Sequence, residues 1–284
     1  MRAVNKQITL LSEAEKSALY ELPDFDYEQR LKYFTLTDQE LQVVLNRQSL
    51  SNQVHCILQI GYFKAVKLFY RITWDDTNTE DCLFIMQQYF SNQQLEQNTI
   101  SKYEYYTQCR TITELFGYSL WGKTHQQLLY SHAAKVLLRD TNPQFIAMEL
   151  LSCLQNQKII RPGYTTLQTI VSAVINIERK RLTDVIRNYL TTEDKNILQA
   201  LLVEESALSK LAAIKQDAKD FKTYMIIDER KKMEILQPVY QITKKLLPNL
   251  RLSQQNMHYY ANLVNYYTNK RDPRRKQRGI LEEH

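Results

Sequence analysis

The stretch SNQVHCILQIGYFKAVKLFYR, residues 51–71, decides the fold class of this chain. Its apolar residues recur at the spacing of a helix, at Val54, Ile57, Leu58, Gly61, Ala65, Leu68 and Phe69. A polar stripe repeats with the same period, at Gln53, Lys64, Lys67 and Arg71. The pattern predicts a helix whose apolar face meets a core, while its polar stripe lies either in solvent or against something negatively charged.

Helical signals continue along the chain. Only 5 Gly and 6 Pro interrupt 284 residues, too few for the many tight turns of a β-sandwich or barrel. Capping boxes mark helix starts at Ser12 and Thr37, and Asn142 stands as a cap residue before Pro143. We therefore expect an all-α fold. The expected helices cover 12–22, 37–47, 51–71, 79–90, 99–117, 124–139, 143–157, 164–190, 192–220, 222–247 and 253–268, with LPDFDYEQ (22–29) among the linkers.

Changes in composition divide the chain into parts. The polar, Gln- and Asn-rich stretch 91–98 lacks apolar anchors, and long helices replace short ones near residue 190. We expect tandem small helical domains followed by long linker helices. The expected parts are a helix-turn-helix-like domain over 1–92, a second helical domain over 93–190, a linker or dimerisation segment over 191–268, and a basic, disordered tail over 269–284.

The net charge of +6 is concentrated near the C-terminal end. The segment KRDPRRKQR, residues 270–278, is strongly basic, and the rest of the chain is nearly neutral. A nucleic-acid surface in the folded part must therefore come from local arrangement of charge. No apolar run is long enough for a membrane helix, and no signal peptide opens the chain, so no membrane partner is expected. The four cysteines are widely separated, which favours reduced, buried side chains in the cytoplasm.

Motifs for catalysis are missing from the sequence. The densest acidic cluster, Asp75, Asp76, Glu80 and Asp81, is interpreted as a solvated turn and the charged start of a helix. No histidine is followed three residues later by arginine, as tyrosine recombinases require, and no glycine-rich phosphate loop occurs. We predict that this chain is not an enzyme and holds no cofactor, metal or small-molecule substrate.

The helices expected at 37–47 and 51–71 are joined by a short turn, as in a helix-turn-helix. The second begins with Ser51, Asn52 and Gln53, and amide side chains there can pair with adenine edges in the major groove. The positive end of the helix dipole also favours a nearby phosphate. Short-linked helix pairs are common in helical proteins. This pattern alone therefore leaves open whether the pair binds DNA or is an ordinary pair of packed helices.

Residues 51–64 resemble a segment of the Tn-three family of replicative (TnpA-type) transposases, whose pattern is roughly N-R-x-G-x-A-x-Q-L-x-x-L-R. Asn52, Gln59 and Ile60 fit the pattern, Phe63 stands for its Leu and Lys64 for its Arg. Four further segments resemble the family in order, so that the similarity covers roughly residues 8–200. These are LLSEAEKSALYELP, YFTLTDQELQVVLNRQ, ITELFGYSLW and LLSCLQNQKIIRPGYTTLQTIVSAVINIERKRL.

The chain also departs from the family pattern. His55 stands where the family commonly has Gly, and Gln53 stands for the Arg of its N-R pair. The stretch YEYYTQC, with Tyr105, Tyr106 and Gln108, replaces an Arg-rich segment that includes a His. These departures matter most in the second expected domain, residues 93–190, where the family's DNA contacts cannot be assigned to this chain residue by residue.

The resemblance implies an N-terminal region that binds the terminal inverted repeats of a transposon. It implies tandem small helical domains, the first similar to centromere-protein-type helix-turn-helix modules. It also implies a distant RNase-H-like domain whose carboxylates hold divalent metal, outside this chain. The implied partners are double-stranded DNA of the transposon ends and the rest of the transposase chain, with a homodimer as an open alternative. The implied location is the bacterial cytoplasm, at the nucleoid.

The residue patterns and the resemblance together predict a set of DNA contacts. Base contacts are predicted for Asn52, Gln53 and His55. Phosphate contacts are predicted for nine polar or basic residues, Lys64, Lys67, Arg71, Lys158, Arg161, Thr165, Arg179, Lys180 and Arg187. An alternative stays open, in which the chain is an all-α interaction scaffold whose long helices after residue 190 pack against a partner or a second copy.

Overall fold

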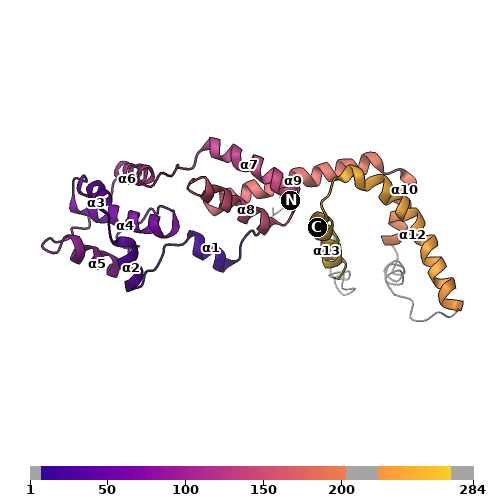
Figure 1. Cartoon of the computed structure of the whole chain (residues 1–284), viewed down its shortest axis with the longest axis horizontal. Helices are drawn as coiled ribbons and strands as arrows, with labels where there is room; N and C mark the ends of the chain where they lie inside the picture. Colours follow the sequence, from indigo (N-terminus) through magenta and orange to yellow (C-terminus); the bar gives the residue numbers. More distant parts are fainter. Residues whose placement is uncertain (1–7, 203–222, 270–284) are drawn as a thin grey trace, which may run out of the picture. The chain divides into compact units, whose positions relative to one another are not determined.

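The computed structural model describes residues 8–202 and 223–269, and this part of the chain is helical (Figure 1). The all-α prediction is confirmed. The helices are α1 (Glu13–Tyr20), α2 (Tyr27–Phe34), α3 (Asp38–Leu45), α4 (Leu50–Val66), α5 (Thr79–Tyr89), α6 (Lys102–Leu115), α7 (Lys123–Leu137), α8 (Pro143–Asn156), α9 (Tyr164–Tyr189), α10 (Thr192–Leu202), α12 (Thr223–Leu250) and α13 (Gln254–Asn269).

The chain forms two compact units. Of the described residues, the first unit comprises 8–137 and 142–173, and the second comprises 138–141, 174–202 and 223–269. Within the first unit, α6 packs against α3 and α4. Contacts therefore cross the joint predicted at 91–98, and the division into domains at residue 92 stays a prediction.

Helix α4 lies at the centre of the first unit, in contact with α2, α3, α5 and α6 (Figure 1). Every residue from Val54 to Phe63 is buried. A helix that is covered all round belongs to a core rather than to a surface, and α4 accordingly supplies most of the apolar cluster of this unit. The sequence of residues 51–71 indicates one apolar face, whereas in the structure almost no side of this helix is exposed.

A close approach of α2 to α4 depends on glycine. A Cβ atom added at Gly61 would lie 2.2 Å from Cε1 of Phe34, and Phe34 is fully buried. No ordinary side chain fits at that separation, because the ring has no free space into which to move. Gly61 therefore sets how closely the two helices pack.

The structure corrects the sequence expectation at two places. The stretch 22–29 is not simply a linker, because α2 begins at Tyr27 after a capping box formed by Asp26 and Gln29. The helix expected over 51–71 ends at Val66, since Lys67 takes the left-handed conformation with φ 55° and closes the helix. The residues that follow are not helical, and Leu68, Phe69, Tyr70 and Ile72 among them pack against the core.

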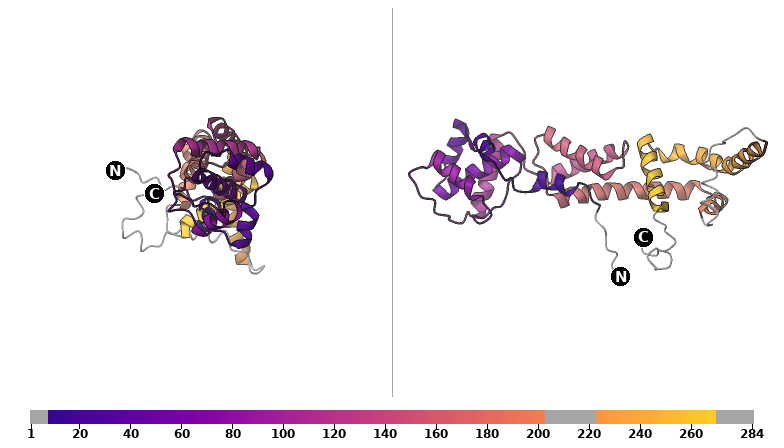
Figure 2. Two further views of the ribbon diagram at one scale, coloured as in Figure 1. Left: turned by 90° about the vertical axis from the view of Figure 1, so that its left-hand side faces the viewer. Right: turned by 90° about the horizontal axis from the view of Figure 1, so that it is seen from below.

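The pair α7 and α8 lies beside the beginning of α9 in the first unit (Figure 2). The loops before and after this pair are joined by backbone hydrogen bonds. Ser119 N donates to Lys158 O at 2.8 Å, and Ile160 N donates to Ser119 O at 2.9 Å. The segment before α1 is tied here as well, because Leu10 N donates to the hydroxyl of Tyr164 at 3.2 Å.

The second unit contains the later part of α9 with α10, α12 and α13. Lys245 of α12 forms an ion pair with Asp194 of α10 at 2.8 Å. Arg181 of α9 pairs with Glu178 and donates to the carbonyl of Leu250, where α12 ends. No helix in the described part is long and apolar enough to cross a membrane. The later part of the helix expected over 192–220 and the basic segment 270–278 lie outside the described residues.

Candidate nucleic-acid interface

A buried polar network links α4 to α6. Nδ1 of His55 lies 2.7 Å from Oε1 of Gln108. The Gln108 amide nitrogen donates to Asn52 O at 3.1 Å and to a Glu104 carboxylate oxygen at 3.0 Å, so its Oε1 is the acceptor and His55 Nδ1 is the donor. The free Nε2 of His55 accepts from Gln59 at 3.4 Å. Burial lowers the pKa of His55, so the ring is neutral.

This network overturns one predicted base contact. His55 is only 2% exposed and both of its ring nitrogens have partners inside the protein, so it does not reach a base edge. Gln59 anchors the same region, because its amide group donates to Tyr70 O at 2.7 Å and accepts from Tyr70 N at 3.2 Å. The polar residues of α4 therefore organise the core and the chain that leaves the helix.

Lys64 and Lys67 also serve the fold. The ammonium group of Lys64 lies 2.7 Å from a carboxylate oxygen of Glu40 and donates to Thr35 O at 2.8 Å, with the side chain 18% exposed. The ammonium group of Lys67 donates to Lys64 O at 2.8 Å, and burial lowers its pKa. Lys64 already has an anionic partner, which opposes its predicted role as a phosphate contact.

Arg161 is a clamp between two helix ends. Its Nη2 donates to Leu19 O in α1 and, at 2.7 Å, to Val66 O at the end of α4. The guanidinium also lies 5.5 Å from the ring centroid of Tyr20, and burial lowers its pKa. These carbonyls lack partners within their helices and carry the negative end of each helix dipole, so the half-buried cation of Arg161 satisfies them. The predicted phosphate contact of Arg161 does not fit this arrangement.

The remaining predicted contacts differ in exposure and stay predictions. Asn52 and Gln53, in the first turn of α4, are half-buried, and the amide of Gln53 donates to Arg47 O at 3.0 Å. Arg71, Lys158 and Thr165 are exposed in the first unit. Three more exposed residues belong to α9 in the second unit, namely Arg179, Lys180 and Arg187. The predicted residues are therefore divided between the two units.

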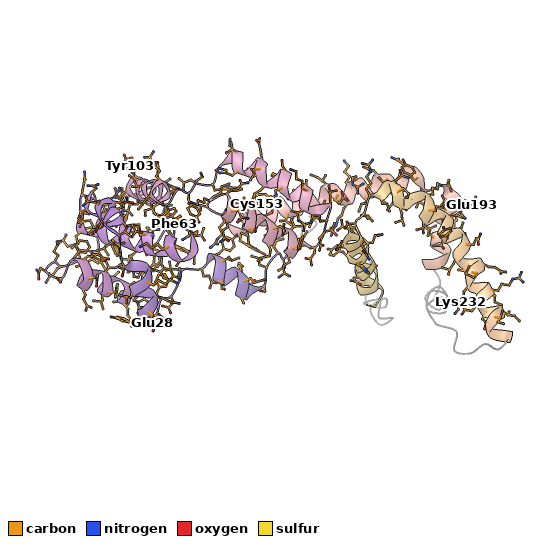
Figure 3. The ribbon with its side chains drawn as sticks, in the orientation of Figure 1. Glu28, Phe63, Tyr103, Cys153, Glu193 and Lys232 are labelled. Carbon is orange, nitrogen blue, oxygen red and sulfur yellow. The ribbon has the colours of Figure 1, made fainter. Side chains whose placement is uncertain are left out.

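Sequence reasoning missed an exposed face of α6, which includes Tyr103 (labelled in Figure 3). This α6 face consists of Lys102, Tyr103, Tyr106 and Arg110, which follow one another at helical spacing. Tyr103 is 78% and Tyr106 57% exposed. Glu104 turns inward and lies 3.6 Å from Arg47, so it does not neutralise the face. The spacing of Lys102, Tyr106 and Arg110 at i, i+4 and i+8 is the sequence signal that could have found it.

One residue of the acidic cluster, Asp81, departs from the expectation. Asp81 is fully buried, and one of its carboxylate oxygens lies 2.7 Å from Nε of Arg30. Asp81 stands in the first turn of α5, as predicted, but it is buried rather than solvated, whereas Asp75, Asp76 and Glu80 are exposed. Within residues 8–202 and 223–269, no group of three or more His, Cys, Asp or Glu side chains is placed to hold a metal ion.

Residues 10–174 match the family described as "Domain of unknown function (DUF4158)". The match covers more than half of the chain. The chain belongs to this family. DUF4158 is commonly found in the N-terminal regions of Tn-three-family transposases. No curated protein matches the chain in sequence.

The DUF4158 match coincides with the first structural unit. The match ends at residue 174, and the first unit ends at Ala173, within α9. The buried network of α4, the Arg161 clamp and the α6 face all lie inside the DUF4158 domain. The candidate interface is therefore a feature of this domain, and Arg179, Lys180 and Arg187 lie beyond it.

Proposed function

We propose that this chain binds the terminal inverted repeats of a transposon in a sequence-specific manner, as the N-terminal, non-catalytic part of a transposase. The observation that carries the proposal is membership of the DUF4158 family, which is commonly found in that position of Tn-three-family transposases. The resemblance of residues 51–64 to the transposase pattern agrees with it. The partner is double-stranded DNA in the bacterial nucleoid.

The exposed chemistry of the first unit supports a role for α6 in this binding. Lys102 and Arg110 offer cations to the phosphate backbone, and the rings of Tyr103 and Tyr106 lie between them on the surface. Phosphate contacts position a protein on DNA, whereas side chains that reach base edges provide specificity. We assign the α6 face, together with Arg71 beside it, to the phosphate contacts that position the protein on DNA.

The body of α4 is not available to enter a groove, because α2, α3, α5 and α6 surround it. Only its first turn can approach DNA, through the half-buried amides of Asn52 and Gln53. We therefore propose that α4 supports the interface from within and that base contacts from it are limited to this turn. Strand cleavage, which needs carboxylates around divalent metal ions, is assigned to another part of the transposase.

Fluorescence anisotropy with a labelled duplex of the terminal repeat tests the proposal. The full chain is titrated at several salt concentrations against the repeat and against a scrambled duplex of the same composition. We expect the repeat to bind at least about a hundredfold more tightly, with an affinity that falls steeply as salt rises. Equal affinity for both duplexes would reject specific recognition.

A feature of the second unit favours the alternative, a protein–protein scaffold. Four exposed apolar residues of α12 follow one another at intervals of seven, namely Ile226, Met233, Tyr240 and Leu247. A seven-residue apolar repeat is typical of helices that pair along their length. In this alternative, the apolar repeat of α12 pairs with a second copy of the chain. Sedimentation equilibrium of the full chain and of Tyr240→Glu tests it, since a scaffold dimer would dissociate in the variant and would not require DNA.

A further inference from the structure

A pocket of about 350 Å³ lies in the first unit, where the chain leaving α4 passes the beginning of α6. Its walls include Arg71, Trp74, Lys102 and Tyr105, and its floor includes His55. A volume of this size is within the range of pockets that hold small molecules. Arg71 and Lys102 are exposed at this pocket, whereas His55 is buried.

The aromatic groups of the pocket are held in fixed positions. The ring centroid of His55 lies 6.4 Å from that of Trp74, at an interplanar angle of 76°, and 6.3 Å from that of Tyr105, at 70°. The indole N–H of Trp74 donates to Asn98 O at 2.8 Å. Two half-buried aromatic side chains thus line the pocket, and such surfaces suit a flat, apolar ring.

The charges of the pocket are positive and unpaired. Neither Arg71 nor Lys102 forms an ion pair with a carboxylate in the described part of the chain. Asp76 is outside the pocket lining, and its carboxylate accepts from the amide of Thr73 at 3.1 Å and from its hydroxyl at 2.7 Å, which lowers its pKa. The pocket therefore combines flat aromatic walls with two free cations, and a ligand that matches both has a planar ring and an anionic group.

We propose that this pocket binds one nucleotide, with its base against Trp74 and Tyr105 and its phosphate between Arg71 and Lys102. The nucleotide has two sources, a free nucleoside monophosphate or an unstacked nucleotide within a DNA strand. Only the second source rests on the proposed function. The same contacts serve both, since each offers a π-face to the aromatic rings and a phosphate to the cations.

Tryptophan fluorescence measures binding of a free nucleotide. The chain has two tryptophans, so Trp121→Phe leaves Trp74 as the single reporter. The full chain with this change is titrated with deoxyadenosine monophosphate, deoxyadenosine and inorganic phosphate. We expect saturable quenching by the nucleotide, with the nucleoside and phosphate each about tenfold weaker, because each lacks one of the two contacts. Circular dichroism melting checks that every variant is folded.

Matched variants separate the pocket from general charge. Arg71→Gln with Lys102→Gln is expected to weaken nucleotide binding at least about tenfold. Lys32→Gln removes an exposed cation from α2, outside the pocket and outside the α6 face, and is expected to leave nucleotide binding unchanged. Tyr105→Leu removes one aromatic wall without changing charge and is expected to reduce the preference for nucleotide over phosphate.

The second arm uses 2-aminopurine in the terminal-repeat duplex, either paired or in a one-base bulge. A pocket-bound base changes the fluorescence of the bulged duplex only, and the double variant removes that change. A signal with the monophosphate alone identifies a free nucleotide as the ligand, and a signal with the bulge alone identifies a strand nucleotide. If neither signal depends on Arg71 and Lys102, the pocket proposal is overturned. In that case tight, specific anisotropy binding of the intact repeat would still support the proposed function.

Discussion

Nδ1 of His55 lies 2.7 Å from Oε1 of Gln108, and this hydrogen bond joins the central helix α4 to α6 inside the core. Both residues stand at positions where the chain departs from the transposase pattern that it resembles. The departures are physically coupled, because a buried imidazole needs an acceptor and the Gln108 amide provides it. The same bond positions the helix that carries the proposed interface.

Removing one partner of this bond is expected to cost more than removing both. Gln108→Leu leaves the Nδ1–H of His55 buried without an acceptor, which destabilises the fold by about 1–3 kcal/mol. His55→Leu combined with Gln108→Leu replaces both groups with apolar ones and is expected to cost less than the sum of the single changes. Urea unfolding measures the cycle. Gln127→Leu, at an exposed position of α7, is the control, and additive costs in the cycle would contradict the coupling.

Burial of His55 also predicts a pH dependence of stability. Its folded pKa is lowered by desolvation, so below the unfolded pKa of about 6.5 the unfolded chain binds a proton that the folded chain does not. The free energy of unfolding should therefore fall as pH drops from about 7.5 towards the lowered folded pKa. His55→Gln should show a shallower fall over this range. The exposed His258→Gln should behave as the wild type. Equal slopes for wild type and His55→Gln, from urea unfolding at each pH, would exclude this origin.

Helix positions follow from the sequence because caps and periodicity are local. Ser12 and Thr37 cap helices as predicted, and Asn142 caps α8. Helix α2 gives a weak apolar pattern over eight residues, and its local signal is the capping box of Asp26 and Gln29. Element type was thus accessible from short-range signals, while the end of α4 depended on the left-handed Lys67.

Site residues are harder to predict because a polar residue on a helix face can either remain exposed to solvent and a ligand or pair with another group of the protein. Lys64 and Arg161 look like surface cations in sequence, yet they bind Glu40 and the carbonyl of Val66. These partners are 24 and 95 residues away along the chain, so no local pattern identifies them. His55 is paired across 53 residues for the same reason. Tertiary packing, which periodicity does not encode, decides which charges remain for a ligand.

The contact of Gly61 with Phe34 predicts an overpacked core in Gly61→Ala. The new Cβ would lie 2.2 Å from Cε1 of a fully buried ring, so the two helices must separate. We expect a loss of about 1–3 kcal/mol in the free energy of unfolding, although alanine normally favours a helix over glycine. Urea unfolding tests this. Gly122→Ala is the control, since its Cβ meets nothing within 4 Å, and a stable Gly61→Ala variant would refute the close approach.

Cations of the α6 face are expected to contribute to the salt dependence of DNA binding. Lys102→Gln with Arg110→Gln removes two phosphate contacts, so the slope of log affinity against log salt should fall by about 2. Affinity should weaken for the terminal repeat and for unrelated DNA alike, because phosphate contacts do not depend on sequence. Anisotropy titrations over a salt series measure both effects. Lys32→Gln, an exposed change in α2, should leave the slope unchanged; an equal loss there would indicate general charge rather than this face.

Arg161→Met is expected to lower stability without changing the salt slope of DNA binding. The variant keeps an unbranched side chain but removes the guanidinium and so leaves the carbonyls of Leu19 and Val66 without their cation, which costs about 1–3 kcal/mol. The slope should stay constant because a guanidinium bonded to two carbonyls and lying over Tyr20 is not available to phosphate. Lys158→Gln, three residues earlier and exposed, should change stability by less than about 0.5 kcal/mol. If the Arg161→Met chain were as stable as the wild type and its salt slope fell by about one unit, the predicted phosphate contact of Arg161 would be supported after all.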